Sequence, residues 1–165
     1  MIKHILAATI VLTASFAFGD DQVSVHVQPT NFQGPRQLQG QTQSAVIRDY
    51  LQSWQSLHTA LDQNNAALLD PDFVGTAHDK LAATIQQQAS LGIRTRYQDR
   101  AHDIQIVFYS PEGLSIQLID NVDYDTQVLD HDKVLTTQRV HARYVVVLTP
   151  AEARWRVRLF QADSQ

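Results

Sequence analysis

The stretch that decides the fold lies near the C-terminus, where VHARYVVVL (residues 140–148) is followed by a short turn and RWRVRLF (residues 154–160). Side chains alternate between the two faces of a strand, so each run presents one mainly apolar face. In the second run that face comprises Trp155, Val157 and Leu159. A four-residue loop between the runs predicts that Val146 lies opposite Val157. A sheet with one apolar face must be covered, so we expect helices upstream.

The helical patterns do lie upstream. Apolar residues recur every three or four positions through residues 44–63, which predicts an amphipathic helix with Ser44 as its N-cap. A short helix is expected at 64–69, and a third begins at Thr76 and ends at Gly92. Period-two patterns then predict strands at 95–101, 104–109, 114–124, 134–148 and 154–161. The predicted fold class is α+β, with N-terminal helices packed on a curved antiparallel sheet.

The first 19 residues have the pattern of a signal peptide. Lys3 precedes an apolar run at 5–18, and Ala17-Phe18-Gly19 is a small-x-small cleavage site. The run is short for a bilayer span of about 20 residues. We therefore expect an exported protein, periplasmic or secreted, with no membrane span after cleavage. The 146 residues that follow Gly19 are enough for one domain.

Residues 20–43 are rich in Gln, Pro, Gly and Thr, which predicts a flexible linker before a domain at 44–165. The alternation Val23-Ser24-Val25-His26-Val27 leaves a second interpretation open. In that interpretation the segment adds an edge strand to the sheet or clamps onto a partner.

Composition excludes several classes of function. The chain has 13 basic and 17 acidic residues without a basic cluster, so no nucleic acid is expected as partner. It has no cysteine, which excludes disulfides, a thiol nucleophile and a thiolate metal site. The pairs His102-Asp103 and Asp130-His131 are interpreted as surface and turn residues, so we expect no metal and no cofactor. Phosphate-binding loops and serine-hydrolase motifs are absent from the sequence.

The order of helices and strands resembles the NTF2-like superfamily, which includes SnoaL-like and ketosteroid-isomerase-like branches. The resemblance covers about residues 44–161 and is carried by YLQSW (50–54), by residues 144–148 and by residues 154–159. It implies a cone-shaped fold in which helices close one side of a bent sheet, often around a pocket. The superfamily includes dehydratases, isomerases and non-catalytic binding modules, so the fold alone does not choose a function.

The resemblance implies a pocket in the cone, for which the predicted lining is Tyr50, Trp54, His58, Leu118, Asp120 and Tyr144. Asp120 interrupts the apolar face of the strand at 114–124, and a carboxyl in an apolar pocket acquires a raised pKa that suits a general base. Tyr50 could serve as a donor and His58 as a base paired with Asp120. These three are weak catalytic candidates, because no set of positions matches the catalytic motif of the family. The alternative is that Tyr50 and His58 are core residues and Asp120 lies at a strand bend.

An outward row on the last two strands is the other candidate site, with the predicted interface residues Val145, Val147, Arg156, Arg158 and Phe160. Arginine and aromatic residues are enriched at interfaces, whereas a solvated sheet face is the alternative. The preferred hypothesis is an exported, non-catalytic module. It binds a small apolar molecule in the cone or a protein partner, a second copy included, through the open sheet face. The alternative hypothesis is a SnoaL-like dehydratase or isomerase.

Overall fold

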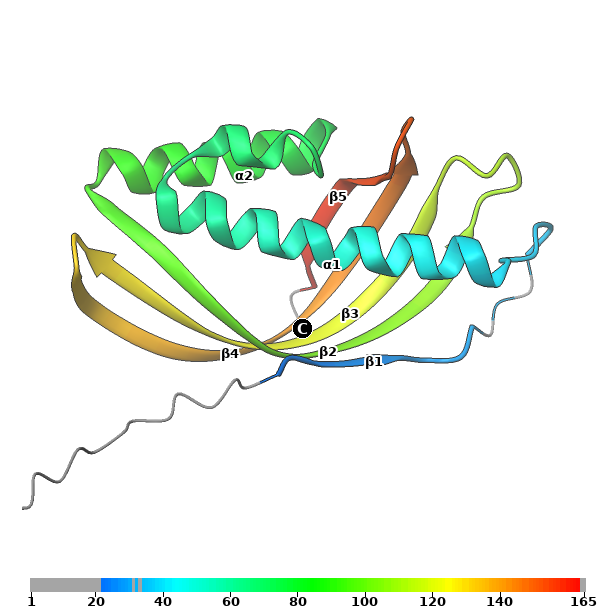
Figure 1. Ribbon diagram of the computed structural model, residues 1–165, viewed down its shortest axis with the longest axis horizontal. Coiled ribbons are helices and arrows are strands. Elements are labelled where there is room, and N and C mark those ends of the chain that lie inside the picture. Colours follow the sequence, from blue (N-terminus) through cyan, green and yellow to red (C-terminus); the bar gives the residue numbers. More distant parts are fainter. Residues whose placement is uncertain (1–21, 31, 33, 164–165) are drawn as a thin grey trace, which may run out of the picture.

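The computed structural model describes residues 22–30, 32 and 34–163, so the predicted signal peptide lies outside the described residues. The chain forms helix α1 (Gly40–Gln63), the 3₁₀ helix η1 (Ala66–Leu69) and helix α2 (Gly75–Ser90). The strands are β1 (Ser24–Val27), β2 (Ile93–Tyr109), β3 (Ile116–Asp130), β4 (Lys133–Pro150) and β5 (Trp155–Ala162). They form one sheet in the order β1-β2-β3-β4-β5. Figure 1 shows both helices above the concave face of this bent sheet, which confirms the α+β prediction.

The sequence predicted some of the helix boundaries but not all of them. Helix α1 begins at Gly40, four residues before the expected N-cap Ser44, and ends at Gln63, after which Asn64 adopts the left-handed conformation with φ 52°. Gly92 adopts φ 70° two residues after the end of α2, as expected for a glycine that stops a helix. No helix among the described residues is long and apolar enough to cross a membrane.

The segment expected as a linker takes part in the sheet. Strand β1 pairs in parallel with β2, with Ser24 opposite Ala101 and Val27 opposite Ile104. The Gln28 N–H continues the ladder by donating to the Ile104 carbonyl at 2.8 Å. Residues 40–43 belong to α1. The segment expected to be a flexible linker therefore contains an edge strand, which was the second interpretation, and the start of the first helix.

Two of the four register shifts in the sheet decide where the candidate site residues point. In β2 the pairing with β3 skips from Asp99 to Ala101, and the residues expected to form two strands form one continuous strand. In β5 the pairing with β4 skips Arg158. Val157 consequently lies opposite Leu148, so the expected pairing of Val157 with Val146 is wrong. An extra residue reverses which face every later side chain points to.

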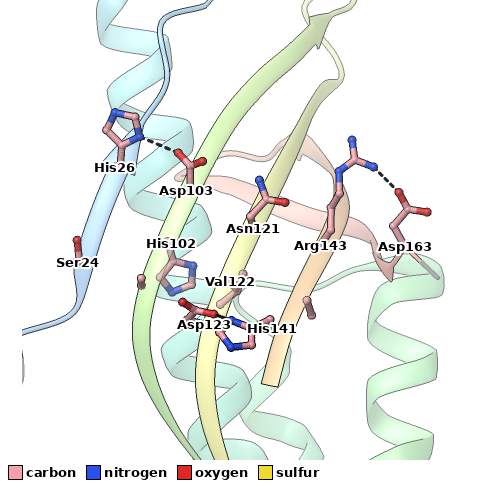
Figure 2. Close-up of a pocket in the computed structure, with 12 residues that line it drawn as sticks. Ser24, His26, His102, Asp103, Asn121, Val122, Asp123, His141, Arg143 and Asp163 are labelled. Carbon is pink, nitrogen blue, oxygen red and sulfur yellow. Dashed lines mark hydrogen bonds and ion pairs between the residues drawn. The ribbon is translucent and has the colours of Figure 1, made fainter. Parts of the chain in front are cut away.

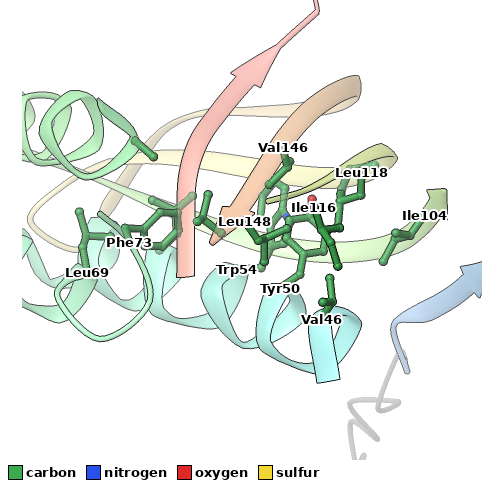
Figure 3. Close-up of a cluster of buried hydrophobic side chains, with 14 of the residues drawn as sticks. Val46, Tyr50, Trp54, Leu69, Phe73, Ile104, Ile116, Leu118, Val146 and Leu148 are labelled. Atoms are coloured by element: carbon green, nitrogen blue, oxygen red, sulfur yellow. The ribbon is translucent and has the colours of Figure 1, made fainter. Parts of the chain in front are cut away.

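The core lies between α1 and the concave face of the sheet. Trp54, Tyr50, Phe73 and Leu118 are at most 2 % exposed, and Figure 3 shows Tyr50 and Trp54 of α1 pointing toward β3 and β4. The outer edge of β5 is closed by the segment between η1 and α2. There Val157 N–H donates to the Asp72 carbonyl at 2.8 Å, which fixes the last strand against the helical layer.

Candidate functional site

A buried polar cluster lies between α1 and the sheet. Tyr50 Oη donates to Asp120 Oδ2 at 2.7 Å, and His102 Nδ1 lies 2.7 Å from the same oxygen. Asp120 is fully buried and His102 is 2 % exposed. Asp120, predicted from its interruption of an apolar face, therefore points inward beside Tyr50.

The cluster continues toward the far end of β2. His102 Nε2 lies 3.6 Å from Asp99 Oδ2, and His58 Nε2 lies 3.3 Å from Asp99 Oδ1. The carboxylate beside His58 is thus Asp99, whereas the sequence suggested Asp120. Tyr50, His58, Asp99, His102 and Asp120 are called the buried cluster below.

The surroundings of the two imidazoles shift their pKa values in opposite directions. Burial by itself would lower the pKa of His102, but its hydrogen bonds to Asp120 and Asp99 outweigh this and raise the pKa to about 9. Burial lowers the pKa of His58 despite the nearby Asp99. Burial, followed by the charge of Asp120, raises the pKa of Tyr50 well above its usual value. At neutral pH the cluster therefore holds an imidazolium at His102 and a neutral imidazole at His58.

The sequence analysis missed Asp99, and its interpretation of His102 as a surface residue is wrong, because His102 is 2 % exposed. Residues three apart in a regular strand point to opposite faces. The bulge that skips Arg100 brings Asp99 to the same inner face as His102. A bulge leaves no clear signal in a single sequence, so the spacing alone gave no reason to pair these two residues.

Trp54 occupies the interior of the cone. The centroid of its indole lies 5.3–6.1 Å from the ring centroids of His58, His102, Tyr124, Tyr144 and Phe160. The indole is 2 % exposed, and Leu118 and Tyr50 are fully buried. The predicted pocket residues Tyr50, Trp54, His58, Leu118, Asp120 and Tyr144 are brought together here as a packed core. Trp54 Nε1 and Asp120 Oδ1 are buried without a hydrogen-bond partner.

A surface groove reaches Asp99 and His102 of the buried cluster. It has a volume of ≈ 340 Å³ and lies between β1 and α1. Val25, Leu51 and Gln55 line its mouth, and Asp99 and His102 lie at its base. Carboxylate and imidazole in contact can exchange a proton, but this pair is nearly inaccessible to a substrate, with side chains 3 % and 1 % exposed.

A larger hollow, of ≈ 650 Å³, lies on the outer face of the sheet (Figure 2). Two rows of aligned residues cross the strands there and are called the outer rows below. The first contains His26, Asp103, Asn121 and Arg143, and the second contains Ser24, Ala101, Asp123 and His141. The sequence analysis did not identify this site. Its only signal is polar residues at positions 103, 121, 123, 141 and 143, which alternate along the strands that contain them.

Ion pairs tie the outer rows together. His26 Nδ1 lies 2.7 Å from Asp103 Oδ1, His141 contacts Asp123, and Arg143 donates to Asp163. The hydrogen bond to His26 holds the pKa of Asp103 below its usual value. Within the described part of the chain, no group of three or more His, Cys, Asp or Glu side chains is arranged to hold a metal ion.

The predicted interface residues divide between the two faces. Val145 and Val147 are partly exposed, and Arg158 is exposed on the bulge of β5. Arg156 donates to the Phe73 carbonyl at 3.1 Å and thereby ties β5 to the helical layer. Phe160 stacks on Tyr144 with ring centroids 4.6 Å apart, inside the cone. Its expected outward position is therefore wrong, because the bulge at Arg158 turns it inward.

Comparison with known proteins gives similarity of structure only. No protein-family model matches the chain, and no curated protein matches its sequence. The intermembrane-space region of the chloroplast protein ARC6 matches with a TM-score of 0.64 and 10 % identity, over 79 % of this chain and all of that chain. A putative scytalone dehydratase from Novosphingobium aromaticivorans matches with a TM-score of 0.53 and 13 % identity, over 76 % and 89 %. The Kfla4162 protein from Kribbella flavida matches with a TM-score of 0.51 and 8 % identity, over 73 % and 90 %. This chain shares with these structures an order of helices followed by a bent sheet. That arrangement is the NTF2-like fold.

Proposed function

We propose that this protein is an exported, non-catalytic NTF2-like module that holds a protein partner against the outer face of its sheet. The observation that carries the proposal is the contrast between the two faces. The inside of the cone is filled by Trp54, whereas a hollow of ≈ 650 Å³ opens on the outside. A binding site needs accessible concave surface, and among the hollows described above only the outer one combines that volume with exposed polar groups.

The chemistry of the outer rows favours a protein over a small apolar molecule. The hollow is lined by three carboxylates, those of Asp103, Asp123 and Asp163, together with imidazole and guanidinium groups. Transfer of apolar surface onto such groups would remove their water without replacing their hydrogen bonds. A polypeptide supplies both amide groups and charged side chains, so it can replace that water.

The first experiment tests whether the cone is filled. We expect the apolar fluorescent probe 1-anilinonaphthalene-8-sulfonate to give no enhanced emission with the wild-type protein under native conditions. A Trp54→Ala variant that remains folded should bind the probe, because the lost indole leaves an apolar cavity. Equal binding by the wild type and the variant would show that the cone is open without the substitution, and would remove the main support for the proposal.

The second experiment tests the outer face. A photo-crosslinking amino acid at Asn121, in the first outer row, should form a crosslink to a partner in the compartment where the protein resides. The same amino acid at Gln87, exposed on α2, is the matched control. Charge reversal at Arg143→Glu should abolish the crosslink at Asn121. Equal crosslinking at both positions, or none at Asn121, would contradict the proposal.

A second candidate function, acid–base catalysis on a small molecule, is favoured by the buried cluster. Tyr50, Asp120 and His102 form a hydrogen-bonded donor–carboxylate–imidazole set of the kind that stabilises an enolate. Catalysis would require Trp54 to move and admit a substrate. A Trp155→Phe variant isolates the emission of Trp54, and titration with 2-naphthol as a model phenolic ligand reports its displacement. A saturable change that Asp120→Asn removes would favour the enzyme over the binding module.

Export is the part of the proposal that rests on the N-terminal sequence. We expect the mature chain to begin at Asp20, after the small-x-small site. Mass spectrometry of the protein recovered from the cell envelope and the medium measures this directly. A protein that retains Met1 through Gly19 inside the cell would contradict export.

A further inference from the structure

Strand β4 is much longer than β5, the strand that pairs with one of its edges. It runs from Lys133 to Pro150, but β5 pairs only with residues 144–150. Within the part of the chain that the structure describes, no strand pairs with the other edge of residues 133–143 (Figure 1). The side chains from Lys133 to Arg139 are all exposed, including Val134 at 44 % and Leu135 at 52 %. These residues, 133–143, are called the open edge below.

The backbone of the open edge is set up to receive another strand. The Asp163 N–H donates to the Arg143 carbonyl at 2.7 Å, so the backbone groups of Arg143 point toward the β5 side. Backbone groups alternate in direction along a strand, so those of Thr137, Arg139 and His141 point the same way. N-terminal to Arg143, no described strand lies beside these backbone groups. They form a row of unused donors and acceptors of the kind that an added strand satisfies.

The charge pattern of the sheet indicates what kind of strand fits. From Lys133 to Leu148 the sequence contains no acidic residue. Across the existing β3–β4 pair, Asp125 lies opposite Arg139 and Asp123 lies opposite His141. Opposite charges placed directly across a strand pair stabilise it, and like charges destabilise it. A strand on the other side of β4 meets the same basic row, so acidic side chains on its outer face are favoured.

We propose that the open edge binds an extended, acidic segment of a partner protein as a sixth strand of the sheet. The inference rests on the proposed function and names the partner class for it. The open edge is continuous with the hollow of the outer rows, which His141, Ala142 and Arg143 of β4 also line. The apolar side chains of Val134 and Leu135 give the added strand apolar contacts at the far end.

A second copy of this chain fits the open edge poorly. In an antiparallel pairing of two such edges, side chains of the outer face must lie opposite side chains of the same face. The outer-face positions toward the sheet centre are Arg139, His141 and Arg143. Each register that pairs this region with itself places these basic groups near one another, which the pairing rule disfavours.

The test uses a synthetic peptide as the probe, an acetylated heptapeptide in which glutamate alternates with valine, and its lysine–valine counterpart. We expect the acidic peptide to slow amide hydrogen exchange at Thr137, Arg139 and His141, whose N–H groups it would engage. The lysine peptide should bind at least tenfold more weakly. Methylation of alternate peptide nitrogens on the edge that pairs should abolish binding, and methylation on the opposite edge should leave it intact. Equal loss with both methylated peptides, or no slowing of exchange, overturns the inference.

An Arg139→Pro variant provides the matched change in the protein. Its missing N–H is one that points to solvent, so the fold should persist, since proline is tolerated on edge strands. The variant should lose peptide binding, whereas Arg139→Ala should weaken binding but retain the slowed exchange. Concentration-dependent dimerisation by sedimentation, abolished by Arg139→Pro, would assign the edge to a second copy and overturn the inference.

The same variant distinguishes this inference from the proposed function. A crosslink at Asn121 that persists in Arg139→Pro would show that a partner occupies the outer face without adding a strand, which overturns only the inference. Absence of the crosslink in the wild type contradicts the proposed function. Peptide binding at the open edge would then stand as an independent observation.

Discussion

The hydroxyl of Tyr50 donates to Asp120 Oδ2 across 2.7 Å, which joins α1 to the central strand β3 between residues 70 positions apart. The same oxygen lies 2.7 Å from His102 Nδ1, so one buried carboxylate oxygen serves two partners from two elements. Burying a polar group costs free energy unless it is hydrogen-bonded, and both of these contacts use Oδ2. The contact therefore links the docking of the first helix to the position of His102 in the sheet.

Tyr50→Phe tests this coupling. The variant keeps the ring but removes the donor to the buried carboxyl group of Asp120, so we expect the free energy of unfolding to fall by about 1–3 kcal/mol. Urea denaturation monitored by tryptophan emission measures it. Tyr97→Phe is the control, because no hydrogen bond of its hydroxyl to a described residue is present, and a change within about 0.5 kcal/mol is expected. Equal losses in the two variants would contradict the role given to Tyr50.

The pH dependence of stability follows from His102. Its pKa in the folded state, about 9, lies above the value of 6.5 for the free side chain. The folded state thus binds the proton more tightly, and the resulting stabilisation is fully present below pH 6.5 and is lost as the pH rises through 9. The shift corresponds to about 3 kcal/mol. Thermal unfolding between pH 6 and 9.5 measures the decline.

His102→Gln should flatten that decline, whereas His131→Gln, at an exposed turn, should leave it unchanged. His58 acts in the other direction. Its lowered pKa means that the folded state favours the neutral ring, so stability is lost as the pH falls below 6.5. We expect maximal stability near pH 6.5. A stability that rises steadily from pH 6.5 to 9 would contradict the assigned charge of His102.

The order of elements and the inward position of Asp120 could be predicted from the sequence, because both depend on periodicity. The partners of Asp120 could not. His102 and Asp99 meet on one face only because β2 contains an extra residue at Arg100. Phe160 was misplaced for the same reason, since β5 contains an extra residue at Arg158. Alternation identifies the face of a side chain only up to the next bulge.

Asp72 should be the strongest single electrostatic anchor of β5. Its carboxylate is 2 % exposed and accepts from Ser56 Oγ and from Arg154 Nη1 at 2.8 Å. Asp72→Ala leaves the half-buried Ser56 hydroxyl without its acceptor and removes the buried partner of Arg154, and we expect a loss of about 2–4 kcal/mol. Arg154→Ala removes only a half-exposed partner and should cost less than about 1 kcal/mol. Urea denaturation of both variants distinguishes the two effects, and equal losses would show that the ion pair alone anchors the strand.

The edge strand β1 should open independently of the rest of the sheet. It has four residues, and its side chains are tied to β2 through Asp103, which is bonded by His26 Nδ1 at 2.7 Å and by Gln28 Nε2 at 2.8 Å. Short exposed edges exchange their amide hydrogens by local opening, which has a smaller free energy than global unfolding. The Gln28 N–H, bonded to the Ile104 carbonyl, should exchange at least tenfold faster than the N–H of Leu118 in central strand β3.

Asp103→Ala removes both side-chain ties and should speed exchange at Gln28 further without changing Leu118. Asp123→Ala is the matched control, because it lies on the same outer face but pairs with His141 of β4. It should leave Gln28 unchanged. Hydrogen exchange followed by NMR resolves these amides individually. If Gln28 and Leu118 exchanged at the same rate in the wild type, β1 would open only when the whole domain unfolds, because a strand that shares the stability of the core has no smaller opening of its own.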